Sequence, residues 1–410
     1  MNPIHRSRCA LLLTLFAAPC PALPADPGAP LRWADVAELL PALPGVREAR
    51  ARAEGAAGAV SAAGAIPNPT VTVSGGEAEA RSGPDHRREW GIAVEVPLDF
   101  LATRGPRVAA AKASQRAATI EAEVARAQAL RMARREFIAL AHGQAQLEAQ
   151  VELEAQVARL TSLVRTRAQR GEARPTEVPR VEIELERLRT AIARTRSSTD
   201  ALRTRLSTTL GVPIRRVEAD LERSLVPPPR EVLESRLVTA APGVEAARAR
   251  VVAASEELSA ERRERVPKVS VGAGHVEELD RRATSVTATV TVPLWSWNGG
   301  RVRQAEANVL AEQARLEATT RDTRASTSDA WHACAAGRAN AARFRDEVLP
   351  RAEASARTMG RAFELGEAGL LDVIDARRIL LDTRREYLDL LLEMQNACGD
   401  LAALAGLELP

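Results

Sequence analysis

Two segments in each half of the chain alternate strictly between apolar residues and polar or small ones. Val71 and Val73 alternate with threonine and serine over 70–74, and the alternation resumes over 90–98 after a polar stretch. In the second half, valine and alanine at even positions alternate with serine and threonine over 285–291. A period of two is typical of β-strands with one apolar and one wetter face. We therefore predict four strands, at about 70–77, 89–98, 268–277 and 284–294.

Long segments with helical periodicity follow each pair of strands. From Arg107 to Arg170 there is no proline and only one glycine, which predicts a helix on the order of 95 Å long. Mostly apolar residues in this helix are spaced alternately by three and four: Leu130, Ala133, Phe137, Leu140, Gln144, Leu147 and Val151. The returning segment of the second half has the same spacing at Leu370, Val373, Arg377, Leu380, Arg384, Tyr387, Leu391, Met394, Cys398 and Leu401. This spacing is the seam of helices that pack side by side. It favours antiparallel coiled-coil hairpins over a solitary charged rod.

The same order of elements occurs twice. Pro44-Gly45-Val46 recurs as Pro242-Gly243-Val244, and Gly171-Glu172-Ala173 recurs as Gly366-Glu367-Ala368. Repeats at a nearly constant offset indicate a duplicated structural unit. We predict a first repeat over 26–222 and a second over 223–410, each with a helix, two strands and a long helical hairpin. A segment at Trp33 to Ala65 is the predicted first helix.

Residues 1–25 have the character of an export signal. A basic start is followed by an apolar run over 10–18 and a Pro/Ala segment. The apolar run is far shorter than the ~20 residues of a transmembrane helix. Cys20 could carry a lipid, but Pro19 before it fits that signal poorly, so cleavage near Ala22 or Ala25 is favoured.

The composition and the absence of certain motifs argue against several classes of function. Acidic and basic residues number 54 and 57, giving a net charge of +3, whereas a nucleic-acid partner calls for a concentrated basic patch. The sequence has no Gly-rich phosphate-binding motif and no zinc-type spacing of Cys and His. We predict neither an enzyme nor a bound cofactor.

The predicted strands are about as long as the ~9–11 residues that cross a bilayer as a tilted β-strand. Four strands cannot close a barrel, since the smallest bacterial barrels have eight, and an open sheet in lipid leaves edge amides unpaired. Three copies would supply twelve strands, while a soluble hairpin with an ordinary wet face is the alternative. The lipid-facing residues in the oligomer would be Val71, Val73, Ile92, Val94, Val96, Val269, Val271, Val286, Val290 and Val292. Trp90, Trp295 and Trp297 would lie at strand ends, near the membrane interfaces.

In this order of elements the chain resembles the TolC-type outer-membrane factor family. The resemblance rests on the Asn68-Pro69 step, on the strand ends at Pro97 and Pro293, and on a helix-turn-helix signature over 363–376 with a looser copy over 169–178. The family implies a mainly helical chain whose homotrimer forms a twelve-stranded outer-membrane barrel continuous with a periplasmic α-barrel. It also implies that the tube docks through its helical tips onto a periplasmic adaptor tied to an inner-membrane pump.

Within that resemblance, the tips are Gly171, Glu172, Gly366 and Glu367. A glycine-rich turn between helices explains these residues equally well without an adaptor. The compact length is most similar to the CzcC-like heavy-metal branch, which implies metal cations as cargo. Drug or organic-solute efflux and type I secretion are alternatives, as is a periplasmic adaptor or scaffold without a barrel.

Asp372 and Asp375 are the residues that we single out. Their spacing places both carboxylates on one face of a helix beside the tip turn, and the resemblance puts both at a constricted periplasmic mouth. Three chains would give rings of carboxylates, which favour cations. The alternative is that these residues pair with Arg377 or Arg378 on a wet surface. The family's best-known tyrosine and arginine latch positions read Phe363 and Ala368 here, which puts that latch in doubt.

Cys334 and Cys398 are each 32 residues from Gly366 (366 − 334 and 398 − 366), so a helical hairpin would bring them to one height. Export would place them in an oxidising compartment. Neighbouring helix axes are ~8–10 Å apart, often too wide for the ~4.4–6.8 Å Cα separation of a disulfide. The sequence therefore favours two separate buried thiols over a bridge.

Overall fold

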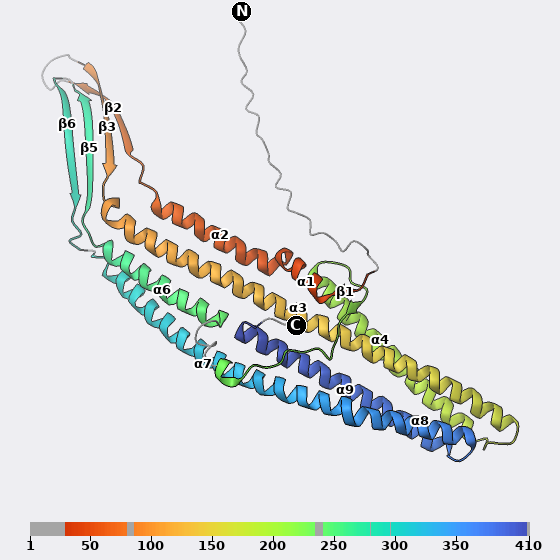
Figure 1. Ribbon diagram of the computed structural model, residues 1–410. Helices are drawn as coiled ribbons and strands as arrows, with labels where there is room; N and C mark the ends of the chain where they lie inside the picture. Colours follow the sequence, from red (N-terminus) through yellow and green to blue (C-terminus); the bar gives the residue numbers. More distant parts are fainter. Residues whose placement is uncertain (1–28, 80–85, 234–240, 279, 296, 408–410) are drawn as a thin grey trace, which may run out of the picture.

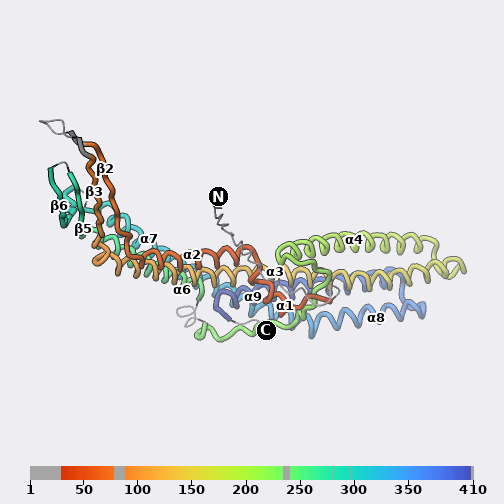
Figure 2. The backbone as a smooth tube through the Cα atoms, turned by 90° about the horizontal axis from the view of Figure 1, so that it is seen from above, coloured from red at the N-terminus to blue at the C-terminus, as the bar shows by residue number. Residues whose placement is uncertain are grey.

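The computed structural model describes residues 29–79, 86–233, 241–278, 280–295 and 297–407, so the predicted export signal at 1–25 lies outside the described residues. The chain is strongly elongated (Figure 1), with a sheet at one end, long helices running away from it, and two helical turns side by side at the opposite tip. Viewed from above, the helices next to the sheet lie in a thin layer, whereas toward the tip they spread apart, with one helix of each hairpin on either side (Figure 2).

The first repeat begins with short elements beside the middle of the bundle and then runs to the sheet and back. Its elements are β1 (Leu31–Arg32), α1 (Trp33–Leu39), the 3₁₀ helix η1 (Leu40–Ala42), α2 (Pro44–Gly64), β2 (Thr70–Glu79), β3 (His86–Pro97), α3 (Phe100–Gln169), α4 (Glu177–Leu210) and β4 (Val217–Glu218). The predicted helix at Trp33 to Ala65 is therefore interrupted. Leu43 is extended and Pro44 begins α2, because the residue before a proline disfavours helical geometry.

The second repeat has the same order. Its elements are α6 (Pro242–Arg263), β5 (Lys268–Glu277), β6 (Arg282–Thr291), α7 (Gly299–Arg343), the π-helical segment η2 (Phe344–Val348), α8 (Leu349–Leu365) and α9 (Leu370–Ala405). The π-helical segment ends two residues before Pro350, which has no N–H to donate to the carbonyl four residues earlier. The first repeat has no proline at the corresponding position of α3, and α3 continues there without interruption.

The duplication extends to backbone conformation. Among the described glycines, those with positive φ are Gly171, Gly211, Gly366 and Gly406. They form two pairs that are 195 residues apart (366 − 171 and 406 − 211), and each follows a long helix. A left-handed residue after a helix is a common terminating geometry that glycine adopts without steric cost. The two repeats therefore end their corresponding helices with the same left-handed glycine.

The four long strands form one antiparallel sheet in the order β2-β3-β5-β6. The predicted strands are confirmed, with ends that differ by a few residues. The last paired residues of β5 and β6 are Lys268 and Thr291. Val292, which we predicted as a strand residue, lies one position beyond the ladder, because Pro267 in the next register position has no N–H to donate.

Helix α3, the long helix of the first repeat, has 70 residues and is about 105 Å long at 1.5 Å per residue. It begins at Phe100 rather than at Arg107, so Pro106 lies inside the helix, where its missing N–H leaves one backbone hydrogen bond unmade. The seam predicted for α9 is buried or half-buried throughout. The seam predicted for α3 fails at its last position, where Val151 is 42% exposed. Burial continues instead through Leu153, Val157, Leu160 and Val164, where α3 packs against α4.

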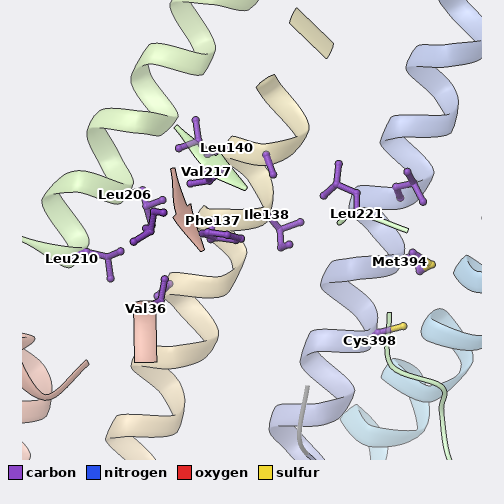
Figure 3. Close-up of a cluster of buried hydrophobic side chains, with 14 of the residues drawn as sticks. Val36, Phe137, Ile138, Leu140, Leu206, Leu210, Val217, Leu221, Met394 and Cys398 are labelled. Atoms are coloured by element: carbon purple, nitrogen blue, oxygen red, sulfur yellow. The ribbon is translucent and has the colours of Figure 1, made fainter. Parts of the chain in front are cut away.

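Two apolar cores lie along the bundle. Halfway along, Phe137 and Leu140 of α3 face Leu206 and Leu210 of α4 and Val36 of α1 (Figure 3), and the parallel pairing of β1 with β4 closes this cluster. Near the tip, a second core is formed by α3, α4 and the turn between α8 and α9. Burial of these aliphatic side chains, at about 25 cal/mol per Å² of apolar area, stabilises the helical layer.

The two cysteines form a disulfide between α7 and α9, so the prediction of separate thiols is wrong. The Cα atoms of Cys334 and Cys398 are 4.7 Å apart. The helices approach this closely because Gly337, one turn along α7, has no side chain where the backbone of Met394 passes. An ordinary spacing of ~8–10 Å between helix axes would have kept the two cysteines apart, but the absence of a side chain at Gly337 allows a closer approach.

Candidate functional site

The register of the sheet gathers apolar residues on one face. Val71 pairs with Val94, Val73 with Ile92, and Val269 with Val290, and residues directly opposite each other share a face. The ladder between β3 and β5 pairs Val96 with Val271 on the same face. The predicted lipid-facing residues other than Val292 therefore form one surface. It is open: Val286 is 86% exposed and Val73 is 74% exposed.

The opposite face of the sheet carries small and hydroxylic side chains. Residues on it include Thr70, Thr72, Ser74, Gly91, Ala93, Ser270, Gly272, Gly274, Ser285, Thr287 and Thr289. Valines exposed on one face and threonines on the other are the pattern of a strand between lipid and water.

The aromatic residues lie at the two ends of this surface. Trp90 is at the end far from the helices, where its Nε1 donates to Glu277 Oε2 at 3.1 Å. Trp295 and Trp297 follow β6 at the helical end and are 93% and 55% exposed. Tryptophan is enriched at both interfaces of a membrane, with its ring in the headgroup region. The two positions bracket the apolar face.

The outer edges of β2 and β6 have no strand partner among the described residues, because each has one neighbour in the sheet. Such edges carry rows of N–H and C=O groups that can pair with another strand. Each edge is about ten residues long. The sheet can therefore extend at both sides through strands from further copies.

At the opposite end, the predicted tip residues form two equivalent turns. Glu172 N donates to Arg167 O at 2.8 Å in the first, and Glu367 N donates to Ala362 O at 2.8 Å in the second. With Gly171 and Gly366 left-handed, both are Schellman-type helix ends. Gly171, Glu172, Gly366 and Glu367 are all exposed. The tips present two similar polar turns to the surroundings.

Asp372 and Asp375 are both exposed on the first turns of α9, but they differ in role. Asp372 Oδ2 accepts a hydrogen bond from Gly369 N at 2.9 Å, which satisfies one free N–H of the helix start. Asp375 has neither an ion pair within 4.0 Å nor a side-chain hydrogen bond within the described chain. Its carboxylate interacts with the charge of Arg378, three residues on, only at longer range.

The arginines that could have neutralised these carboxylates are directed elsewhere. Arg377 Nη1 donates to Gln156 O at 2.8 Å, and burial lowers the pKa of its guanidinium. Arg378 Nη2 contacts both oxygens of Glu184, at 3.0 and 2.9 Å, and this hydrogen bonding raises the pKa of Arg378. Neither aspartate forms a salt bridge with these arginines within the described residues, although the charge of Asp375 also contributes to the raised pKa of Arg378.

Sequence reasoning missed Arg167, which joins the two tips. From the end of α3, its Nη1 donates to Phe363 O at 3.1 Å and its Nη2 to Glu364 O at 2.9 Å. Its guanidinium lies 5.1 Å from the centroid of the Phe363 ring. A cation at the C-terminal end of α8 satisfies carbonyls that the helix leaves free. Only the tertiary structure reveals this contact, since the partners are about 196 residues apart.

Residues 37–212 and 234–407 match the model of the family described as outer membrane efflux protein. This chain belongs to the outer membrane efflux protein family. The family is one of channels, so the predicted outer-membrane location and the absence of enzymatic activity agree with this membership, and the hypothesis of a periplasmic adaptor or scaffold is set aside. None of the helices within the described ranges combines the length and apolarity needed to cross a bilayer.

Individual relatives are distant. The chain is 28% identical over 185 residues to the cobalt-zinc-cadmium resistance protein CzcC of Cupriavidus metallidurans, an alignment that covers 44% of this chain and 43% of that relative. The fold is similar to that of the VceC outer membrane protein of Vibrio cholerae, with a TM-score of 0.75, 19% identity and coverage of 91% and 96% of the two chains. It is also similar to the MtrE outer membrane channel of Neisseria gonorrhoeae, with a TM-score of 0.78, 16% identity and coverage of 92% and 89%.

Proposed function

We propose that three copies of this chain form the exit duct of a tripartite efflux system, which an inner-membrane pump drives through a periplasmic adaptor and which conducts heavy-metal cations. The observation that carries the proposal is the four-stranded sheet with one apolar face and two unpaired edges. A sheet in lipid has to close on itself, since each unpaired edge amide costs several kcal/mol.

One copy supplies four strands, below the minimum of eight for bacterial barrels, whereas the twelve strands of a trimer, the assembly that the family resemblance implies, are within the known range. In such a barrel β6 of one copy would pair with β2 of the next. The valine face would then contact lipid and the threonine face would line the bore. The long helices continue from the strands, so the same closure would bring three helical layers into one tube.

The tips support an adaptor as the periplasmic partner. The turns at Gly171 and Gly366 are exposed and have the same hydrogen-bonding pattern. A trimer would therefore offer six similar turns around its mouth. This repetition suits a ring of adaptor hairpins, each recognising one turn.

The cargo assignment rests on two features. The relative CzcC is a cobalt-zinc-cadmium resistance protein by name. In a trimer the unpaired Asp375 carboxylates would form a negatively charged ring, which favours cations over anions. Efflux of drugs or other organic solutes, and type I secretion, are the alternatives that an experiment has to separate.

Cargo can be tested by deleting the gene in its native host and measuring growth inhibition. We expect sensitivity to Co²⁺, Zn²⁺ or Cd²⁺ to rise at least several-fold, with sensitivity to apolar antibiotics unchanged. The converse result would assign the duct to organic solutes. Trimer formation is tested separately by the mass of the detergent-solubilised protein. A monomer that stays soluble without detergent would overturn the entire proposal.

A further inference from the structure

A pocket of about 420 Å³ lies halfway along the bundle, between α1, α3 and the last turns of α9. Figure 1 shows that these three helices come together near the C-terminal end of the described chain. The walls of the pocket are largely apolar, with Trp33, Leu130, Ala402 and Leu407 among the lining residues. Two arginines, Arg131 and Arg134, also line the pocket, and none of its lining residues is acidic.

Arg134 is a buried cation without an anionic partner in the described part of the chain. Its side chain is 7% exposed, and its Nε has no hydrogen-bond acceptor. Nη2 donates to the neutral amide oxygen of Gln395 at 2.8 Å, and the guanidinium lies 5.5 Å from the centroid of the Trp33 ring. An ionised group in such a place carries a desolvation penalty that a neutral amide only partly offsets.

The surroundings of Arg134 are built to hold it in place. The amide nitrogen of Gln395 donates to Leu221 O at 2.8 Å and to Arg223 O at 2.7 Å, which turns the amide oxygen toward Arg134. Gly399 leaves room for the arginine, since a β-carbon there would lie 3.1 Å from Arg134 Nε. Burial lowers the pKa of Arg134, but a guanidinium stays charged in proteins.

Neighbouring arginines on the surface of α3 and α4 show what is unusual here. Arg135 forms an ion pair with Asp400, and Arg205 forms one with Glu136 at 2.8 Å. These arginines have carboxylate partners although water could solvate them. The buried Arg134 and the half-buried Arg131 have no ion pair in the described ranges. The pocket thus keeps two positive charges beside an apolar wall.

We propose that this pocket binds a small amphiphilic anion, with a carboxylate or phosphate head group at Arg134 and Arg131 and an apolar chain along Trp33, Leu130 and Leu407. Guanidinium groups bind both head groups through paired hydrogen bonds. The volume is within the ~300–1,000 Å³ of small-molecule sites, which are mostly apolar with a few placed polar groups. The pocket lies at the opposite end of α9 from Asp375 and the tip turns, and the proposal does not depend on the proposed function.

Calorimetric titration of the purified mature protein in an uncharged maltoside detergent tests the proposal, with octanoate, octyl phosphate, 1-octanol and inorganic phosphate as probes. We expect at least one of octanoate and octyl phosphate to bind at least about tenfold more tightly than both octanol and inorganic phosphate, and the stronger of the two identifies the head group. Arg134→Gln should weaken that binding at least about tenfold. Arg135→Gln, next to it in sequence but ion-paired on the surface, should leave it unchanged.

A second variant guards against misfolding of Arg134→Gln. Ala37 is exposed on the rim of the pocket, so Ala37→Trp should fill the pocket and abolish binding while the melting temperature stays the same. Equal affinity for octanoate and octanol, or binding that survives both variants, would overturn the proposal. So would binding that appears only after Glu408→Gln, since a carboxylate of the chain itself would then be the natural occupant.

Discussion

A β-carbon placed on Gly337 of α7 would lie 3.1 Å from the Cα of Met394 in α9, so the two helices touch backbone to backbone at this height. Such a contact has no room for even a methyl group unless the helices move apart. The disulfide between Cys334 and Cys398 lies one helical turn away. The glycine and the disulfide therefore belong to one close helix crossing.

We predict that Gly337→Ala lowers the free energy of unfolding by about 1–3 kcal/mol, because overpacking a tight contact displaces backbone. Gly360→Ala is the matched control, since Gly360 also lies in a helix but nothing lies within 4 Å of its added β-carbon. It should stabilise by about 0.5–1 kcal/mol through helix propensity. Thermal unfolding followed by circular dichroism would show shifts of opposite sign, and equal shifts would contradict the close crossing.

The disulfide itself is predicted to be formed in the exported protein. Mass spectrometry without reductant should find the mature chain two mass units lighter than after reduction, with a peptide linking Cys334 to Cys398. The bridge spans 64 residues, and the chain-entropy estimate for a loop of that length is about 4 kcal/mol. Replacing both cysteines by alanine should lower the melting temperature, whereas recovery of two free thiols from native protein would contradict this prediction.

Features that depend on local periodicity were predictable from the sequence, and features that depend on how helices meet were not. The α9 seam from Leu370 to Leu401 is buried as its spacing indicates, because one stripe faces one set of neighbours along the helix. The α3 seam changes neighbours midway, which exposes Val151. The contacts of Arg167 and Arg134 are with residues more than a hundred positions away in the sequence. Local residue spacing cannot predict such contacts.

The assignment of the sheet faces is tested by two adjacent positions of β6. Val286 lies on the apolar face and Thr287 on the opposite one, both in the middle of the strand. A lysine on the lipid face of a barrel costs about 2–4 kcal/mol near the bilayer midplane, so Val286→Lys should reduce the amount of heat-modifiable oligomer in the outer membrane. Thr287→Lys should leave that amount close to wild type. The reverse ranking would mean that the faces are exchanged.

The two aspartates of α9 should separate into a structural and a conducting residue. Asp372→Ala removes the acceptor of the hydrogen bond from Gly369 N and should cost about 0.5–2 kcal/mol of stability, as for other helix caps replaced by alanine. Asp375→Asn removes an unpaired surface charge and should change stability by less than about 0.5 kcal/mol. In planar bilayers, however, Asp375→Asn should lower the preference for cations over anions, and Asp375→Lys should lower it further. An unchanged reversal potential in both variants would remove Asp375 from the conduction path.

Tyr387 links stability to alkaline pH. Burial, followed by the hydrogen bond that its hydroxyl donates to Glu222 Oε1 at 2.7 Å, raises the pKa of this phenol. The folded chain therefore keeps the proton to higher pH than the unfolded chain, whose tyrosine titrates near ~10. This contribution to stability is complete below about pH 10 and is lost as pH rises through the folded-state pKa.

Tyr387 is the only tyrosine, so phenolate absorbance at alkaline pH follows this group alone. We expect titration near pH 10 in denaturant and at higher pH in the native protein. Tyr387→Phe should flatten the fall of the melting temperature above pH 10, and a native midpoint equal to the denatured one would contradict the coupling to Glu222.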